Sequence, residues 1–411
     1  MNWQRKKLGE ICEIIAGQAP PSMFYNEEGD GVPFLTVNSF GDVYPKVERW
    51  TTKSLRESKE VDVLFSVAGS LGLVNLGINA CITRSIFALR PYKDLILQKF
   101  LFYTLKKYGS QIALMGSGTA QKVITINQIS KFEIPVPPIH IQQKIVKILD
   151  TIQSAVEVQE KIIEKTKELK KALMNLLFHY GLSGLRIKEL AGLRVDGLTS
   201  SEIKKLGLKL KKTEIGEIPE HWEVVRLGDK KLFELIMGQS PPSISYNQNK
   251  KGLPFLQGKA EFGEIYPQPI KWCDKPIKVA EKNDVLISVR APVGDLNLAD
   301  QKYCIGRGLA SIRLKNNVNP FFLFNCLNFF KNQILTYGTG STFKAITKEI
   351  LENFKIPLPP LYEQKEIAEI LQTIDQKIEI EKKKKELYYE LFKTLLNKIM
   401  NQEIEVDLLD Y

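Results

Sequence analysis

The sequence has few of the residues from which metal sites and disulfides are built. Its 411 residues include five cysteines and three histidines. The cysteine count is odd and no two cysteines form a CxxC pair, which disfavours both a disulfide framework and a structural zinc site. We therefore predict no bound metal, and we expect the cysteines to be buried as small apolar side chains.

Long hydrophobic stretches are also missing. No run of eighteen apolar residues occurs, and the first twenty residues lack the apolar segment of a signal peptide. These absences predict a soluble, cytoplasmic chain without a membrane partner. Hydrophobic residues make up 44% of the chain and charged residues 26%, which is enough to build packed cores and argues against disorder.

Recognisable catalytic motifs are absent as well. There is no GxxxxGK[ST] loop, no GxGxxG opening a helix and no HExxH. GSGTAQK and GTGSTFK are glycine-rich, but their spacing does not suit a phosphate cradle. GQAPPS lacks the Asp or Asn and the aromatic residue that flank the Pro-Pro pair of amino-methyltransferases. His140, His179 and His221 each stand at a segment edge, where we expect surface or capping roles. The sequence therefore predicts a non-catalytic chain without a cofactor of its own.

What the chain does contain is a copy of itself. GQAPPS at 17–22 returns as GQSPPS at 238–243, and sliding residues 116–149 by 222 positions gives 14 identities in 34. This period is too long for a solenoid and indicates a tandem duplication. Each copy opens with a body of short apolar runs, such as DVLFSV and DVLISV, punctuated by Gly, Pro and Asn. With a few helical patches among them, these runs predict a mixed α+β domain.

A long helix is predicted after each body. The bodies end in FEIPVPP (132–138) and FKIPLPP (354–360), and apolar residues then recur with a period near 3.5. Such a seam needs a partner helix, and chain order favours antiparallel packing of the two. Forty-odd helical residues span about 60 Å, so the pair would form a stiff spacer with a body at either end, related by a pseudo-twofold axis. The predicted spacer core comprises Ile152, Val156, Leu169, Leu173, Ile374, Ile378, Leu391, Phe392 and Leu395.

These patterns divide the chain into six segments. The fold class is α+β, with two homologous mixed domains separated by two long antiparallel helices. The predicted segments are a first mixed domain (1–138), spacer helix 1 (139–180), a connector (181–215), a second mixed domain (216–359), spacer helix 2 (360–403) and a tail (404–411).

The net charge of +11 is shared between both copies. Residues 1–138 carry 16 basic and 12 acidic side chains, and residues 216–360 carry 19 and 14. Two mildly basic bodies suit a polyanion that lies across the pair.

Several strings together carry a family resemblance. Each copy opens with (N/H)W…LG and GQ(A/S)PPS and closes with G(S/T)G…IT…F.IP(V/L)PP…Q..I, and IPEHWEVVRLG (218–228) is the most recognisable string. The chain resembles the specificity subunit of type I restriction-modification enzymes over essentially its whole length. The resemblance implies a non-catalytic subunit whose two recognition domains each read one half of a split, asymmetric site on double-stranded DNA. The helices would set the spacing and dock two methyltransferase subunits that bind S-adenosylmethionine. Restriction and translocase subunits would bring ATP and magnesium.

Candidate DNA contacts were sought by comparing the copies. Arg84 and Arg307 recur after similar strands, while other candidates occur in one copy only. Arg84 and Arg307 could bind phosphate or guanine, with a structural salt bridge as the alternative. The lysines and threonines of the two glycine-rich loops suit phosphate contact, with a plain solvated loop as the alternative. The candidates found in one copy only are candidates for base reading. The candidates are Asn38, Asn75, Arg84, Thr119, Lys122, Lys259, Arg290, Arg307, Thr342 and Lys344.

Two other functions remain open from the sequence. A stand-alone DNA-modifying enzyme would need the cofactor motifs that are missing. A coiled-coil scaffold that binds only proteins would explain the helices but not two basic, diverged bodies.

Overall fold

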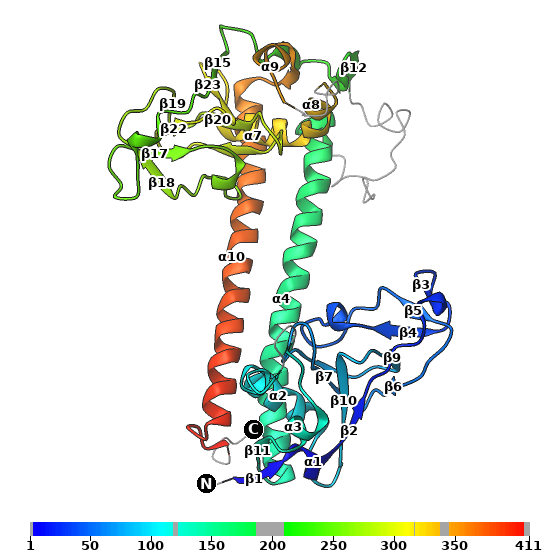
Figure 1. Cartoon of the computed structure of the whole chain (residues 1–411). Coiled ribbons are helices and arrows are strands. Elements are labelled where there is room, and N and C mark those ends of the chain that lie inside the picture. The colour runs from blue at the N-terminus through cyan, green and yellow to red at the C-terminus, as the bar shows by residue number, and fades with distance from the viewer. Residues whose placement is uncertain (1–2, 118–121, 186–208, 316, 338–344, 407–411) are drawn as a thin grey trace. The chain divides into compact units, whose positions relative to one another are not determined.

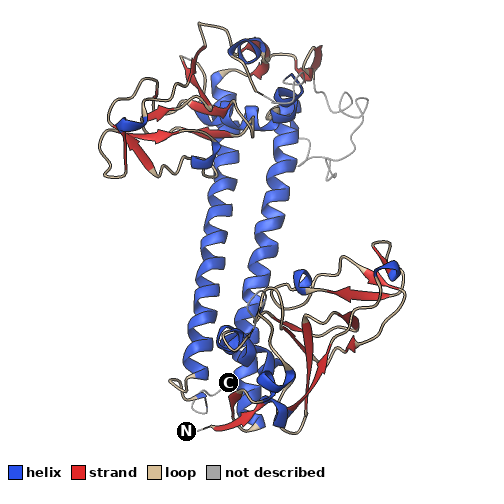
Figure 2. Ribbon diagram, in the orientation of Figure 1, coloured by secondary structure: helices blue, strands red, loops and turns tan. Residues whose placement is uncertain are grey.

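A computed structural model describes residues 3–117, 122–185, 209–315, 317–337 and 345–406. Figures 1 and 2 show the course of the chain and its helices and strands. Among the described residues, no helix is both long enough and apolar enough to cross a bilayer.

Contacts divide the chain into two compact units. The first unit joins Met1–Lys161 to Lys382–Tyr411, and the second is Ile162–Glu381. Two helices pass through both units: α4 (Ile139–Tyr180) and α10 (Leu361–Met400). Each unit therefore combines one body with one end of each long helix.

The first unit is built around two sheets (Figure 1). The four-stranded sheet has the order β2 (Cys12–Ala16), β10 (Ile86–Pro91), β7 (Val63–Ser66), β8 (Val74–Leu76). The five-stranded sheet has the order β3 (Tyr25–Asn26), β5 (Trp50–Thr51), β4 (Val32–Leu35), β9 (Ala80–Ile82), β6 (Glu57–Ser58). A two-stranded pair joins β1 (Gln4–Lys7) to β11 (Glu133–Val136), and the helices of this body are α1 (Leu8–Ile11), α2 (Gln98–Ala113) and α3 (Ile126–Ser130).

The second unit repeats this topology strand for strand. Its four-stranded sheet has the order β15 (Phe233–Met237), β23 (Leu309–Leu314), β20 (Val285–Ser288), β21 (Leu296–Leu298). Its five-stranded sheet has the order β16 (Tyr246–Asn247), β18 (Lys271–Cys273), β17 (Leu253–Leu256), β22 (Tyr303–Ile305), β19 (Val279–Ala280). β14 (Glu223–Arg226) pairs with β24 (Lys355–Leu358), and the body's helices are α7 (Pro320–Phe329), α8 (Lys331–Tyr337) and α9 (Lys348–Asn353). The mixed α+β fold of both copies is confirmed.

The apolar runs that repeat in sequence form the central strands. β7 and β20 are buried at every position, which explains why DVLFSV and DVLISV read as nearly continuous apolar segments. Short one-turn 3-10 helices, η2 (Val37–Ser39) and η4 (Lys259–Glu261), follow β4 and β17 in the two copies.

A buried glutamine fixes the start of each long helix. Gln142 accepts a hydrogen bond from the backbone N–H of Leu97 at 2.8 Å and donates to the carbonyl of Pro137 at 2.9 Å. Gln364 makes the same bonds in the second copy, with the N–H of Asn319 at 2.8 Å and the carbonyl of Pro359 at 2.8 Å. The repeated PP…Q string is therefore a joint that ties each exit strand to the body.

In each unit the beginning of one long helix packs against the end of the other. In the first unit, Ile145 and Leu149 of α4 share a core with Phe392 and Ile399 of α10. In the second, the α4 residue Leu177 and the α10 residue Ile367 share a core. The helices therefore run in opposite directions, as predicted.

Two of the predicted spacer-core residues are wrong. Leu169 is 43% exposed and Leu391 is 46% exposed. Beside Leu169 the seam position is taken by Lys170, which pairs with Asp375 at 2.6 Å. Beside Leu391 it is taken by the buried Phe392. Each leucine stands one heptad position away from the seam and faces outward. The structure buries or half-buries Ile152, Val156, Leu173, Ile374, Ile378, Phe392 and Leu395.

A hairpin lies at the end of the segment predicted to be a connector. β12 (Leu210–Thr213) pairs with β13 (Gly216–Pro219). Its turn uses Gly216 at φ +115°, a conformation that residues with a side chain rarely adopt. The rest of the predicted connector from 186 to 208 lies outside the described residues.

Candidate nucleic-acid interface

The loops that carry the predicted DNA contacts meet in each body. We define the reading face of the first unit as the loops at 36–46, 66–73, 83–85 and 122–125. Its counterpart in the second unit comprises the loops at 257–268, 288–295, 306–308 and 345–346. Backbone hydrogen bonds join the last three of these loops to one another in both copies.

A serine at the end of a buried strand shapes the central turn. The Ser66 hydroxyl donates to the carbonyl of Ser70 at 2.6 Å and accepts from the N–H of Leu73 at 2.8 Å. In the second copy, the Ser288 hydroxyl donates to the carbonyl of Pro292 and accepts from the N–H of Asp295, both at 2.9 Å. The turn is the same although its residues differ.

The residue after this serine links the turn to its neighbouring loops. The N–H of Val67 donates to the carbonyl of Ser85 at 2.8 Å, and the N–H of Ile124 donates to the carbonyl of Val67 at 2.9 Å. In the second copy, Val289 makes both bonds, to Gly308 at 2.8 Å and from Ile346 at 3.0 Å. Three loops are thus fixed by bonds that do not depend on the exposed side chains.

The repeated GQ(A/S)PPS string supports the loop that presents an arginine. A Cβ atom on Gly17 would lie 2.2 Å from the carbonyl oxygen of Thr83, and one on Gly238 would lie 2.2 Å from that of Gly306. Only glycine allows this close approach. The string therefore acts as a support beneath Arg84 and Arg307.

An aromatic stack anchors the prolines of the same string. The Tyr25 hydroxyl donates to the carbonyl of Pro20 at 2.6 Å, and its ring stacks on Phe34 with centroids 4.3 Å apart. Tyr246 repeats this with the carbonyl of Pro241 at 2.7 Å and a stack on Phe255 at 4.6 Å. The repeated aromatic residues are therefore part of the framework.

The structure contradicts the prediction that Asn75 contacts DNA. Its side chain is completely buried, donates to the carbonyl of Gly41 at 2.8 Å and accepts from the N–H of Gly41 at 2.9 Å. Asn297, its counterpart, donates to the carbonyl of Gly263 at 2.9 Å. Buried amides that bond to backbone in this way do not face a base, and their role is to hold the η2 or η4 loop against the sheet.

The other described candidates in the first unit are open to solvent. Asn38, Arg84 and Lys122 are exposed. Within the described part of the chain, neither Arg84 nor Lys122 takes part in an ion pair. The salt-bridge alternative therefore has no support for Arg84 here, and its guanidinium is available to phosphate or guanine.

In the second unit the exposed cations are placed differently. Arg290 and Arg307 are exposed, and the N–H of Arg307 donates to the Ser240 hydroxyl at 3.2 Å. Lys259 is paired: its ammonium lies 2.5 Å from the carboxylate of Asp295, which also bonds Lys331 at the start of α8. Partial burial alone would raise the pKa of Asp295, but its hydrogen bonds to the two lysines outweigh this and keep that pKa below its ordinary value.

Three predicted contacts cannot be placed. Thr119, Thr342 and Lys344 lie outside the described residues.

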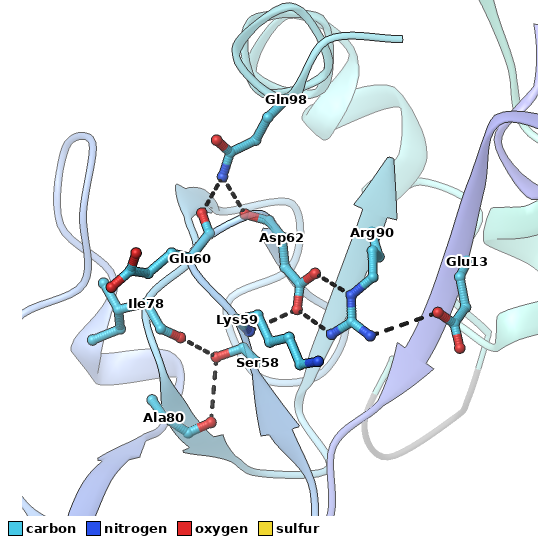
Figure 3. A network of polar contacts seen from close by, with 9 residues as sticks. All are labelled: Glu13, Ser58, Lys59, Glu60, Asp62, Ile78, Ala80, Arg90 and Gln98. Atoms are coloured by element: carbon cyan, nitrogen blue, oxygen red, sulfur yellow. Dashed lines mark hydrogen bonds and ion pairs between the residues drawn. The ribbon is translucent and has the colours of Figure 1, made fainter. Parts of the chain in front are cut away.

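A buried carboxylate stabilises each body away from the reading face. Figure 3 shows Asp62 bound by Arg90 through two hydrogen bonds of 2.8 and 3.0 Å, with the N–H of Lys59 donating at 2.7 Å. Gln98 reaches the carbonyls of Glu60 and Asp62 at 2.6 and 2.9 Å.

The second copy rebuilds this network around Asp284. Its carboxylate accepts from the Ser311 hydroxyl at 2.6 Å and from Arg313 at 3.3 Å. A buried carboxylate that is bound by an arginine in both copies is a structural group, and the repetition of Asp and Arg at these places is visible in the sequence. No cluster of potential metal ligands occurs among the described residues.

Comparison with known proteins agrees with this reading of the site. The model of the type I restriction modification DNA specificity domain matches residues 1–168 and 219–387. In Methanocaldococcus jannaschii, a protein named as the MjaX type I restriction enzyme specificity subunit is 37% identical over 98% of this chain and 94% of its own length. The MjaVIII specificity subunit of the same organism is 26% identical over 100% and 95%.

Solved structures show the same architecture. A chain from a type I restriction-modification system, studied for complex assembly and conformational transition, superposes with a TM-score of 0.58 at 26% identity, covering 97% of both chains. A type I restriction-modification S subunit from M. genitalium superposes with a TM-score of 0.61 at 19% identity, covering 97% of this chain and 96% of that one. With two matched domains, two copies of one reading face and relatives along its full length, the chain belongs to the family of type I restriction-modification specificity subunits, whose role is to recognise DNA sequence.

Proposed function

We propose that each unit reads one half of a bipartite, asymmetric DNA site. One observation carries this proposal: both copies build the same reading face with the same backbone bonds, but present different polar side chains on it. Phosphate contacts position a protein on DNA and contacts to base edges specify sequence. A shared frame with different side chains is what two unlike half-sites require.

The segments predicted from the sequence acquire functions in this proposal. The recognition domains at 1–138 and 216–359 read the two half-sites, and the spacer helices at 139–180 and 360–403 set the gap between them. The connector at 181–215 and the tail at 404–411 complete the chain. It has no catalytic activity and acts in the cytoplasm.

We propose that the long helices also bind the catalytic subunits. In the first unit, α10 exposes Leu387 (69% exposed) and Leu391 (46% exposed), which lie one turn apart on the same face of the helix. Contiguous exposed apolar side chains on one helix mark protein–protein contacts. Two methyltransferase subunits carrying S-adenosylmethionine are the proposed partners, and restriction and translocase subunits would supply ATP and magnesium chemistry.

The test is to express the chain together with the methyltransferase subunit of its own system and to sequence the methylome of the cells. We expect one split DNA motif with two unlike halves, and no methylation when either subunit is omitted. Methylation by this chain alone would establish a stand-alone enzyme. A complex that forms but directs no sequence-specific methylation would favour a protein scaffold.

A further inference from the structure

Three positions of the reading face change together between the two copies. Val37 of η2 corresponds to Lys259 of η4, and Leu73 of the central turn corresponds to Asp295. The third position is Gly109 of α2 in the first copy and Lys331 of α8 in the second. The first copy therefore holds no charge at these places, whereas the second holds a cation, an anion and a cation.

The close approach of helix and turn explains the third position. In the first unit, a Cβ atom on Gly72 would lie 2.6 Å from the carbonyl oxygen of Gly109, so backbone meets backbone. In the second unit, a Cβ atom on Gly294 would instead meet the side chains of Leu335 at 2.9 Å and Lys331 at 3.7 Å. Both turn glycines have φ +83°, so the turn is unchanged and only the side chains around it differ.

The three charged residues form one linked group. The ammonium of Lys259 lies 2.5 Å from Asp295 Oδ2, and Lys331 bonds Asp295 Oδ1. The Asp295 side chain is 18% exposed, whereas those of Lys259 and Lys331 are 47% and 33% exposed. The carboxylate is thus less exposed than either of the two cations that it binds.

Residues that repeat in both copies suit contacts that both half-sites share, and residues that differ between the copies suit contacts to bases. Both half-sites have the same phosphate backbone, so contacts common to them fit the repeated Arg84 and Arg307. Only base edges distinguish the half-sites, and a lysine donor suits the O6 and N7 acceptors of guanine. A flexible lysine loses much side-chain entropy when it is fixed, and a prior ion pair reduces that loss on binding.

We propose that Lys259 contacts a base edge in the second half-site and that Asp295 is the positioning residue that directs its ammonium. Lys331 balances the charge of Asp295, so that the group presents a net positive charge to DNA. This inference rests on the proposed function above, because it needs each unit to read its own half-site.

The experiment compares methylomes directed by variants within the assembled methyltransferase complex. We expect K259M and D295N to relax the same single base position of one half-site, with a roughly fivefold or greater loss of discrimination there. The other half-site should keep its wild-type pattern. Because Lys259 is half exposed, K259M should leave thermal stability unchanged, and it remains decisive if D295N fails to assemble.

The matched control is E281Q. Glu281 pairs with Lys302 at 3.1 Å, and it precedes β20 at the end away from the central turn. Breaking this pair should leave every position of the site unchanged. The inference is overturned if K259M alters no position, or if K259M weakens all positions of both half-sites equally, as loss of a phosphate contact would. A wild-type complex without any sequence-specific methylation would instead overturn the proposed function itself.

Discussion

Two groups of polar residues have different roles in the two bodies. Frame residues are buried and hold strands and loops in place through hydrogen bonds, whereas the others are exposed on the reading face. Asp62 and Asp284 belong to the frame, since each is buried and bound by an arginine and by backbone or hydroxyl donors. Asn75 and Asn297 belong there too. Arg84, Arg290 and Lys259 are exposed and can be changed at small cost in stability.

The frame residues should matter most for stability. Replacing Asp62 by alanine removes both hydrogen bonds from Arg90 and the one from the N–H of Lys59. Breaking a buried pair by removing one partner costs about 3 kcal/mol, so we expect a loss of that order in the free energy of unfolding. Chemical denaturation measures it. E168Q, which breaks the exposed Lys165–Glu168 pair at 2.7 Å, is the control and should leave the free energy of unfolding unchanged within the error of the measurement.

The five cysteines should be unreactive in the folded protein. All are free and buried, and burial raises the pKa of the Cys12 thiol to about 12 and that of Cys304 to about 12. Thiol reagents attack the thiolate, which forms only as the pH rises toward these values. At pH 8 we expect a chromogenic thiol-specific disulfide reagent to label no cysteine rapidly in the native protein. After unfolding, the same reagent should label five thiols. Rapid labelling of Cys12 in the native protein would contradict its burial.

At the scale of elements, the sequence predicted the duplication and the long helices but not the details of their packing. Apolar periodicity identified α4 and α10, because a seam needs a repeating row of apolar side chains. It placed Leu169 in the core, although the seam position beside it is the polar Lys170, which its ion pair with Asp375 makes compatible with packing. It placed Leu391 there because an apolar pair at 391–392 does not show which of its two members faces the partner helix, and the buried member is Phe392.

The sequence-based prediction of DNA contacts is wrong at Asn75, a residue that repeats in both copies. Asn297 occupies the same place in the second copy and makes the same kind of bond. A polar residue repeated in both copies signals the frame, and Ser66 with Ser288 could have been found in this way. Asp295 could not be assigned a role, because its importance depends on Lys331, which comes close only through the fold.

Buried and exposed positions of the two long helices should respond differently to truncation of an apolar side chain. Ile145 is completely buried, whereas Leu391 is 46% exposed. We expect I145A to destabilise the protein by about 2–4 kcal/mol through lost burial and a cavity, and L391A to cost less than about 0.5 kcal/mol. Thermal or chemical unfolding of the isolated chain checks both. A large loss in L391A would restore the sequence-based assignment of that residue to the core.

On the scale of the whole molecule, the duplication predicts modular behaviour. Each body has its own sheets, its own buried carboxylate and its own reading face. Exchanging residues 10–135 for the equivalent body of another family member should therefore change one half of the methylated motif only. Methylome sequencing reads the result directly. A change in both halves would contradict independent reading by the two units.

The long helices predict a second change at this scale. Removing one heptad from both α4 and α10 keeps the seam in register and shortens each helix by about 10 Å. We expect the gap between the half-sites to change while the half-sites themselves stay as they are. The methylome of cells that carry the shortened chain gives both quantities. An unchanged gap would show that the helices do not set it.

The serine-centred turn has a consequence for how new targets arise. Ser66 and Ser288 bond only backbone groups, so the residues between them and the next strand, apart from positive-φ glycines such as Gly72 and Gly294, can mutate while the chain still folds. We expect substitutions in this turn to alter the DNA target without a loss of stability that other mutations must compensate. Divergence of the two copies after the duplication is consistent with this. We therefore expect the capacity to acquire a new target to depend on a hydroxyl group whose bonds in this structure are to the protein's own backbone.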